Sequence, residues 1–147
     1  MLPELDITEL KWFGLVSGMM ERTGPGSIVD RLMPEKRKDT IVSNGNCAKA
    51  LILNTLSSQR AALSMVSSKF ETMPTEHLIT PSIRPEDLNN NDCLGRFLDG
   101  FHEAGGHKIA NQFFLTGLLP ALNSPEWKDN LELHGDLTPF HAPEHDA

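Results

Sequence analysis

The sequence predicts an all-α fold, a compact bundle of roughly six helices with short connecting turns and an irregular acidic C-terminal tail. Three observations predict this fold. Apolar residues recur at helical spacing over most of the first 122 residues, glycines and prolines separate these segments, and no alternating strand pattern of useful length appears before residue 130. With 147 residues, 39% of them hydrophobic, the chain is large enough for one domain with its own core. We therefore expect a helical domain over residues 1–122 and a tail over residues 123–147.

Two helices are expected before residue 34. The first begins near Asp6, whose spacing to Glu9 fits a capping box, and it ends at the Gly-Pro-Gly turn over residues 24–26. Ser27 is then expected to cap a second, short helix, which Pro34 ends.

The most apolar stretch, residues 47–56, predicts the central helix of the domain, opened by Asn44 or Asn46. Because this stretch has little polar surface, other helices are expected to surround it. A further helix is expected over residues 59–70, with an apolar side and a polar side.

Three more helical segments follow, over residues 75–79, about 92–104 and 109–119. The second of them is expected to be capped by Asn91 or Asp92 and closed by a pair of glycines. The third is expected to stop at Pro120, because proline cannot donate the next helical hydrogen bond. In the tail, residues 131–136 read as a short strand.

Charge is distributed unevenly along the chain, whose net charge is -7. Residues 1–70 carry nine Lys/Arg and seven Asp/Glu, whereas residues 71–147 carry four and thirteen. Within the first part, residues 31–69 have a net charge of +5, so this is the stretch that would attract a phosphate backbone. A solvated surface explains the same charges, and charge alone leaves both interpretations open.

Several classes of protein are excluded by simpler features. No apolar run is long enough to span a membrane, and the N-terminus lacks the layout of a secretory signal. Cys47 and Cys93 cannot build a disulfide framework or a zinc site alone, and both lie in apolar helical pattern, where a small buried hydrophobe is the expected role. A cytoplasmic protein is therefore expected.

Two histidine groups do not predict a metal site. His102, Glu103 and His107 resemble a zinc protease helix, but the histidines are five residues apart across a Gly-Gly break rather than four apart on one face. The tail holds a second group of titratable residues, which proline spacing predicts to be solvated. Its members are His134, Asp136, His141 and His145.

Nucleic-acid binding has one local candidate, the pair of helices over residues 44–70. A buried helix followed by a helix with a polar face is the arrangement of a helix-turn-helix motif. Glutamine and arginine suit base edges, and lysines suit phosphates. The candidate DNA-binding residues are Lys36, Arg37, Lys38, Lys49, Gln59, Arg60 and Lys69.

Three segments together resemble a known family. They are SNGNCAKALILN at residues 43–54, IRPEDLN at residues 83–89 and CLGRFLD at residues 93–99. In this order they are similar to the N-terminal domain, itself of unknown function, of a group of DDE-type insertion-sequence transposases. The resemblance covers roughly residues 6–119 and the tail, and it implies a role in DNA transposition.

The tail carries a further part of this resemblance. LHGDLT at residues 133–138 is similar to the first catalytic strand of the family, and Asp136 matches its first acidic position. Such enzymes hold two Mg²⁺ ions with several acidic side chains. The printed sequence ends eleven residues later, so one carboxylate cannot assemble such a site, and we expect no catalysis and no cofactor in this chain.

The resemblance thus implies a non-catalytic domain or fragment of a transposase that contributes to DNA binding or to assembly of the enzyme. Element ends are the expected DNA, and a second copy or the remainder of a transposase the expected protein partner. The alternative is a dimerisation module in which the apolar helices over residues 107–119 or 5–23 pair between chains, with Phe113, Phe114 and Leu118 at the contact. An inactive remnant without DNA affinity is a third interpretation.

Overall fold

The structure, a computed structural model, describes residues 12–36 and 40–129. The helices are α1 (Phe13–Thr23), α2 (Pro25–Leu32), α3 (Asn44–Thr55), α4 (Val66–Phe70), α5 (Thr75–Leu78), α6 (Gly95–Glu103), α7 (Gly106–Phe113), α8 (Leu119–Leu122) and α9 (Pro125–Lys128). Two 3₁₀ turns, η1 (Leu63–Met65) and η2 (Pro85–Asp87), and two π-helical turns, η3 (Asn90–Leu94) and η4 (Phe114–Leu118), complete the described elements. These residues contain no strand, so the predicted all-α fold is confirmed for this part of the chain.

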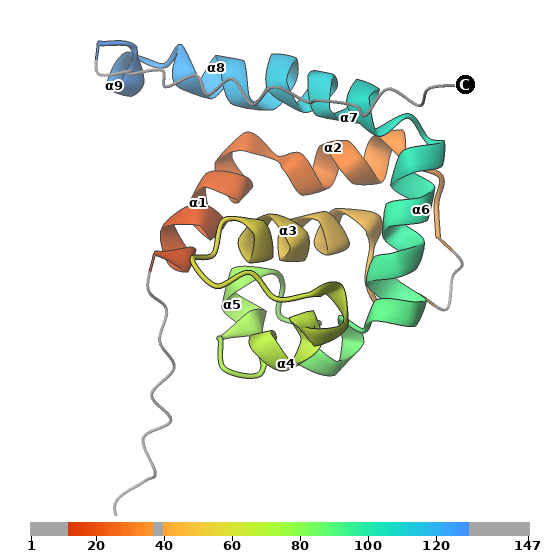
Figure 1. Ribbon diagram of the computed structural model, residues 1–147. Coiled ribbons are helices and arrows are strands. Elements are labelled where there is room, and N and C mark those ends of the chain that lie inside the picture. The colour runs from red at the N-terminus through yellow and green to blue at the C-terminus, as the bar shows by residue number, and fades with distance from the viewer. Residues whose placement is uncertain (1–11, 37–39, 130–147) are drawn as a thin grey trace, which may run out of the picture.

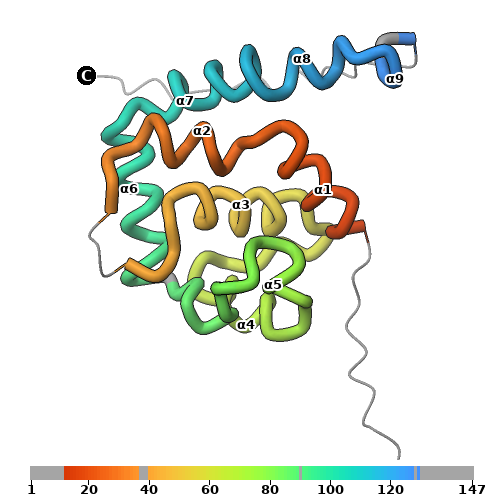
Figure 2. The backbone as a smooth tube through the Cα atoms, turned by 180° about the vertical axis from the view of Figure 1, so that it is seen from behind, coloured from red at the N-terminus to blue at the C-terminus, as the bar shows by residue number. Residues whose placement is uncertain are grey.

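The helices stack in layers around α3 (Figure 1). One layer is formed by α1 and α2, and α4 and α5 lie on the opposite side of α3. The nearly continuous rod of α7, η4 and α8 runs over α2, and α6 stands across the layers at one side; the reverse view shows the same order (Figure 2). The predicted central helix is therefore in the centre.

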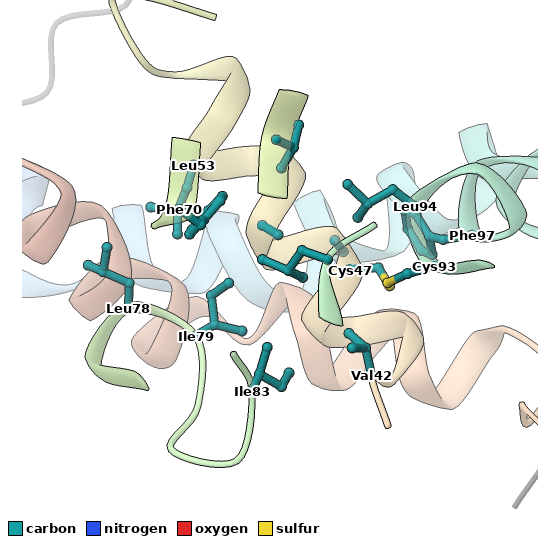
Figure 3. Close-up of a cluster of buried hydrophobic side chains, with 14 of the residues drawn as sticks. Val42, Cys47, Leu53, Phe70, Leu78, Ile79, Ile83, Cys93, Leu94 and Phe97 are labelled. Atoms are coloured by element: carbon teal, nitrogen blue, oxygen red, sulfur yellow. The ribbon is translucent and has the colours of Figure 1, made fainter. Parts of the chain in front are cut away.

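The buried core is built around α3 and the segments that wrap it (Figure 3). Leu53 on α3, Phe70 on α4 and Leu94 in η3 have no solvent exposure. Full burial of each such side chain contributes about 1.5–3 kcal/mol, so this cluster supplies much of the stabilisation of the fold.

The predicted start of α2 is wrong by three residues, whereas α3 begins at Asn44, one of the two residues predicted to open it. Gly24, in the left-handed region with φ of 70°, ends α1 and also precedes α2, so α2 begins at Pro25 and Ser27 lies inside it. Proline suits the first position of a helix because its φ is already helical and its missing N–H is not needed there. α3 is capped by Ser43, whose Oγ accepts a hydrogen bond from the Asn46 backbone N–H at 3.2 Å, rather than by an asparagine.

The predicted helix over residues 59–70 is shorter than expected, because the helical part begins only at Leu63 with the 3₁₀ turn η1 and continues as α4 to Phe70. Side-chain hydrogen bonds hold the preceding residues in a loop. The amide of Asn54 donates to the Ala61 carbonyl and accepts from the Ala61 N–H, both at 2.9 Å, and Ser57 makes a similar local bond with Gln59. Hydrogen bonds from side chains to the backbone compete with the backbone hydrogen bonds of a helix, so they favour the loop here.

The later segments differ from the prediction at their ends. The helix leading into α6 begins with η3, and Asn89 rather than Asn91 or Asp92 accepts the capping bond, from the Asp92 N–H at 2.8 Å. The last long helix passes Pro120 instead of stopping there. Pro120 is the second residue of α8, which comes directly after the wider π turn η4. Because a proline at the start of a helix has no α-helical hydrogen bond to donate, its missing N–H does not interrupt the helix there.

The start of the predicted tail contains a further helix, α9, which ends at residue 128. The predicted strand over residues 131–136, Asp136 and the capping box of Asp6 and Glu9 lie outside the described residues. No helix within residues 12–36 or 40–129 is long and apolar enough to cross a membrane.

A close approach of two glycines joins α2 to α3. A Cβ added at Gly45 would collide with the carbonyl of Gly26 and with the Asp30 carboxylate. That carboxylate accepts the Gly45 N–H at 2.7 Å and the Ser43 hydroxyl at 3.0 Å, so it satisfies the N-terminus of α3. An anion in this position also interacts favourably with the helix dipole.

We expect Gly45→Ala to lower the free energy of unfolding by about 3 kcal/mol, because backbone at the α2–α3 contact must move apart. Gly18→Ala is the matched control: a Cβ there meets nothing within 4 Å. In an exposed helix that change stabilises by up to about 1 kcal/mol. Urea denaturation of both variants measures the difference, and equal stabilities would contradict the close approach.

Candidate nucleic-acid interface

Two of the predicted basic residues, Lys36 and Lys69, lie near opposite ends of α3. Near its start, the Lys36 ammonium donates to the Val42 carbonyl at 3.1 Å and contacts the Cys47 sulfur at 3.4 Å. Near its end, the Lys69 ammonium donates to the Asn54 side chain at 3.1 Å. A helix of 12 residues is about 18 Å long, so these two lysines do not share one contact surface.

Lys49, in the middle of α3, is engaged within the fold. Its ammonium bonds the Glu21 carboxylate on α1, and its side chain is only 14% exposed. Its charge is thereby balanced by a carboxylate, which removes Lys49 from the group of cations that a phosphate would meet. Arg37 and Lys38 lie outside the described residues.

Three of the predicted residues, Gln59, Arg60 and Lys69, line one pocket of about 660 Å³ at the C-terminal end of α3. Gln59 and Arg60 are exposed, and Lys69 is half-buried. Serine hydroxyls of the same loop and of α4 lie on the pocket wall, and none of the lining residues within the described part of the chain is a carboxylate. Cations and hydroxyls without a competing carboxylate are a suitable lining for a phosphate backbone.

Asn54 holds the loop that carries this pocket. Besides its two bonds to Ala61, its side-chain oxygen accepts from Lys69, and Lys69 also donates to the Gln59 carbonyl at 2.7 Å. One buried amide on the central helix therefore fixes the loop over residues 57–61 and the position of the lysine. Burial lowers the pKa of Lys69 from its ordinary value. Two of the three ammonium protons are occupied by these bonds.

Trp12 forms an aromatic wall of the same pocket. It is 40% exposed and stacks on Phe13, with the ring centroids 4.9 Å apart. An exposed indole beside cations is suited to contact a sugar or to stack on a base. Sequence reasoning missed both Trp12 and Asn54. The available signals were a bulky aromatic residue just before a helix and a polar residue near the end of an apolar one.

The helix-turn-helix interpretation is wrong for this part of the chain. Gln59 and Arg60 lie in a loop, and α4 begins only at Val66 and spans five residues. A recognition helix needs several turns to present side chains along the major groove. The geometry fits contacts with the phosphate backbone rather than base readout by a helix.

Carboxylates line two other polar pockets. Glu86, Asp87 and Asp92 line a pocket of about 280 Å³ beside η2 and η3, and Asp30 and Glu35 line another near the start of α3. Both surfaces would repel phosphate groups.

The remaining candidate chemistry finds little support in the described residues. His102 lies near the end of α6 and His107 near the start of α7, on either side of Gly105, whose φ is 78°. In residues 12–36 and 40–129, no group of three or more His, Cys, Asp or Glu side chains could hold a metal ion. The histidines of the tail, His134, His141 and His145, lie outside these ranges, as does Asp136.

Comparison with family models shows which family the chain belongs to. The model described as "Domain of unknown function (DUF4277)" matches residues 5–115, so the chain is a member of that family. The match spans the helices from α1 to α7, including the pocket at the end of α3. No curated protein and no solved structure matches the chain.

We expect Asn54→Ala to lower the free energy of unfolding by about 2 kcal/mol, because it leaves the Ala61 backbone groups and the Lys69 ammonium without their partner. Thr55→Ala is the matched control, an exposed neighbour on the same helix, and it is expected to change stability by less than about 0.5 kcal/mol. Thermal and urea denaturation give both values. A wild-type stability for Asn54→Ala would mean that the amide does not hold the loop.

Proposed function

We propose that this chain is the N-terminal, non-catalytic domain of an insertion-sequence transposase and that it helps the enzyme hold DNA. The resemblance of residues 43–54, 83–89 and 93–99 to such transposases supports the transposition role. The pocket of Gln59, Arg60 and Lys69, whose described lining residues include no carboxylate, is the observation that carries the DNA-binding part of the proposal.

The proposed binding mode is contact with the phosphate backbone through the loop over residues 57–61 and Lys69. The net charge of -7 opposes DNA over most of the surface, so attraction must be local. Backbone contacts position a protein on DNA without reading sequence. In this proposal the element ends are recognised with the help of other parts of the transposase.

Chemistry in this proposal belongs to the intact enzyme. Asp136 resembles the first acidic position of the insertion-sequence transposases. The proposal assigns the other acidic ligands, and the Mg²⁺ ions that they hold, to the remainder of a transposase. The chain itself is proposed to need no cofactor and to act in the cytoplasm.

We expect Arg60→Glu to weaken binding to a random DNA duplex about tenfold at low salt and to reduce the slope of log Kd against log salt by about 1, because one phosphate contact is lost. Fluorescence anisotropy across a salt series measures both quantities. Arg31→Glu is the matched control: it makes the same charge change at an exposed position of α2 that does not line the pocket.

Two results would overturn the proposed binding mode. The first is a wild-type chain without affinity for duplex DNA at low salt. The second is an equal loss of affinity in Arg60→Glu and Arg31→Glu, which would show that the pocket of Arg60 binds DNA no better than the surface around Arg31.

A second candidate function is self-association through the rod of α7, η4 and α8. Phe114 is 47% exposed, Leu115 57% and Leu119 36%, and all three lie on this rod. Phe113 and Leu118, which the sequence also placed at the contact, are half-buried. Large exposed apolar side chains grouped on one element are typical of protein–protein contacts.

If the rod pairs two copies, Leu115→Asp is expected to raise the dimer dissociation constant at least tenfold, because a buried carboxylate would lose its hydration. Light scattering over a concentration series measures this constant. Ile41→Asp, at an exposed apolar residue between α2 and α3, is the control that should not change it. A wild-type chain that stays monomeric at high concentration rules this function out.

A further inference from the structure

The two cysteines of the chain meet inside the core, although 46 residues separate them in the sequence. Cys47 lies in α3 and Cys93 in the π turn η3, and their sulfur atoms are 3.1 Å apart. Both are free thiols, with exposures of 0% and 5%. Figure 3 shows them side by side within the buried cluster. The sequence predicted two separate buried residues, and their burial is confirmed, but it did not predict that they pair.

Lys36 supplies a cation to one sulfur of the pair. Its ammonium lies 3.4 Å from the sulfur of Cys47, while the same ammonium donates to the carbonyl of Val42. A thiolate rather than a thiol is the reactive form of cysteine, and a neighbouring lysine stabilises it. When one of the two thiols is ionised, the ammonium therefore favours the negative charge on Cys47 rather than on Cys93.

The pKa values of the two thiols shift in opposite directions. The hydrogen bond from Cys93 and the charge of Lys36 lower the pKa of Cys47, against burial and the Asp30 carboxylate on α2, which raise it. The bond to Cys47, burial and the Asp87 carboxylate of η2 raise the pKa of Cys93. One thiolate next to one thiol is the pairing that thiol–disulfide chemistry uses.

A small pocket reaches one member of this pair, Cys93, from the surface, and Cys47 does not line it. The pocket of about 280 Å³ beside η2 and η3 is lined by Cys93, by Val42 and by Asp87. It has room for a small neutral oxidant, and its carboxylates disfavour anionic ones. A hydroperoxide is the smallest common oxidant of this kind that reacts with thiolates.

We propose that Cys47 and Cys93 form a reversible thiol–disulfide site that is oxidised by hydroperoxides. Hydrogen peroxide enters through the pocket at Cys93 and reaches the Cys47 sulfur, 3.1 Å from that of Cys93, when the Cys93 side chain moves aside. The Cys47 thiolate attacks one oxygen of the peroxide, the O–O bond breaks, hydroxide leaves, and Cys47 becomes a sulfenic acid. The sulfur of Cys93 then attacks the sulfur of Cys47, and the hydroxyl group leaves as water with the proton of Cys93. Two thiols and one peroxide thus give one disulfide and two waters, with two electrons passing from sulfur to oxygen.

The disulfide would join the first turn of α3 to the turn that leads into α6. The sulfurs need to approach by only about 1 Å to reach bonding distance, so the fold can accommodate the bond with small side-chain movement. Because the bond would close a loop of more than 40 residues, it would also restrict the unfolded chain. Oxidation is therefore expected to stabilise the domain.

The direct test treats the purified full chain with stoichiometric hydrogen peroxide and measures its intact mass. The expected product is a monomer lighter by two hydrogen atoms, with Cys47 and Cys93 in one cross-linked peptide and full reversal by dithiothreitol. Its midpoint of thermal unfolding is expected to rise by about 10 °C. Oxygen addition to single cysteines without a cross-link, or a disulfide between two chains, would overturn the proposal.

A variant tests the role of Lys36 as a positioning residue. Lys36→Met is expected to slow disulfide formation about tenfold at neutral pH and to move the pH–rate profile to higher pH, because the Cys47 thiolate loses its cation. Lys108→Met is the matched control, since it removes an ammonium at an exposed position of α7 that does not line the pocket at Cys93, and it should leave the profile unchanged. Circular dichroism of both reduced variants checks that they are folded, and a profile for folded Lys36→Met identical to wild type would remove Lys36 from the site. Because DNA is absent from these measurements, their failure is distinguishable from a failure of the proposed DNA binding.

Discussion

The contact between α2 and α3 at Gly26 and Gly45 is the constraint on which the rest of the structure depends. Only glycine lets the two backbones approach this closely, and Asp30 uses the approach to satisfy the N-terminus of α3. The position of α3 then determines where every other layer packs, because α1, α4 and α5 all lie against it or beside it. The same helix carries Asn54 at one end and Cys47 at the other, so both sites discussed above depend on how it is held.

The general architecture could be predicted because the spacing of apolar residues along the sequence indicates which helices, and which of their faces, are buried. The apolar stretch over residues 47–56 identified the central helix, and glycines at residues 24 and 105 marked real ends of helices. The errors arose where a side chain competes with backbone hydrogen bonding. The side chain of Asn54 keeps residues 57–61 out of a helix, and the π turn η4 lets a helix continue past Pro120. Neither effect changes the spacing of apolar residues along the sequence, so the spacing could not predict them.

The candidate site could be predicted only in part, for a related reason. The count of charged residues identified the basic stretch over residues 31–69. It did not show which lysine ammonium groups are already bonded to other groups of the domain. Lys36 and Lys49 each contact a partner inside the domain, whereas Gln59 and Arg60 reach the surface beside Lys69. Lysine side chains are long and flexible, so their partners depend on tertiary structure, which a single sequence does not reveal. The pairing of Cys47 with Cys93 escaped prediction in the same way.

Gly24 has a consequence for how the chain tolerates changes in length. This single residue ends α1 and precedes α2, so no spare loop separates the two helices. Each residue inserted within α2 before Asp30 would rotate the carboxylate by about 100° around the helix axis. One added residue would therefore turn Asp30 away from the backbone that it caps. The number of residues between Gly24 and Asp30 is thus constrained by geometry, in addition to the burial of four of the five residues between them.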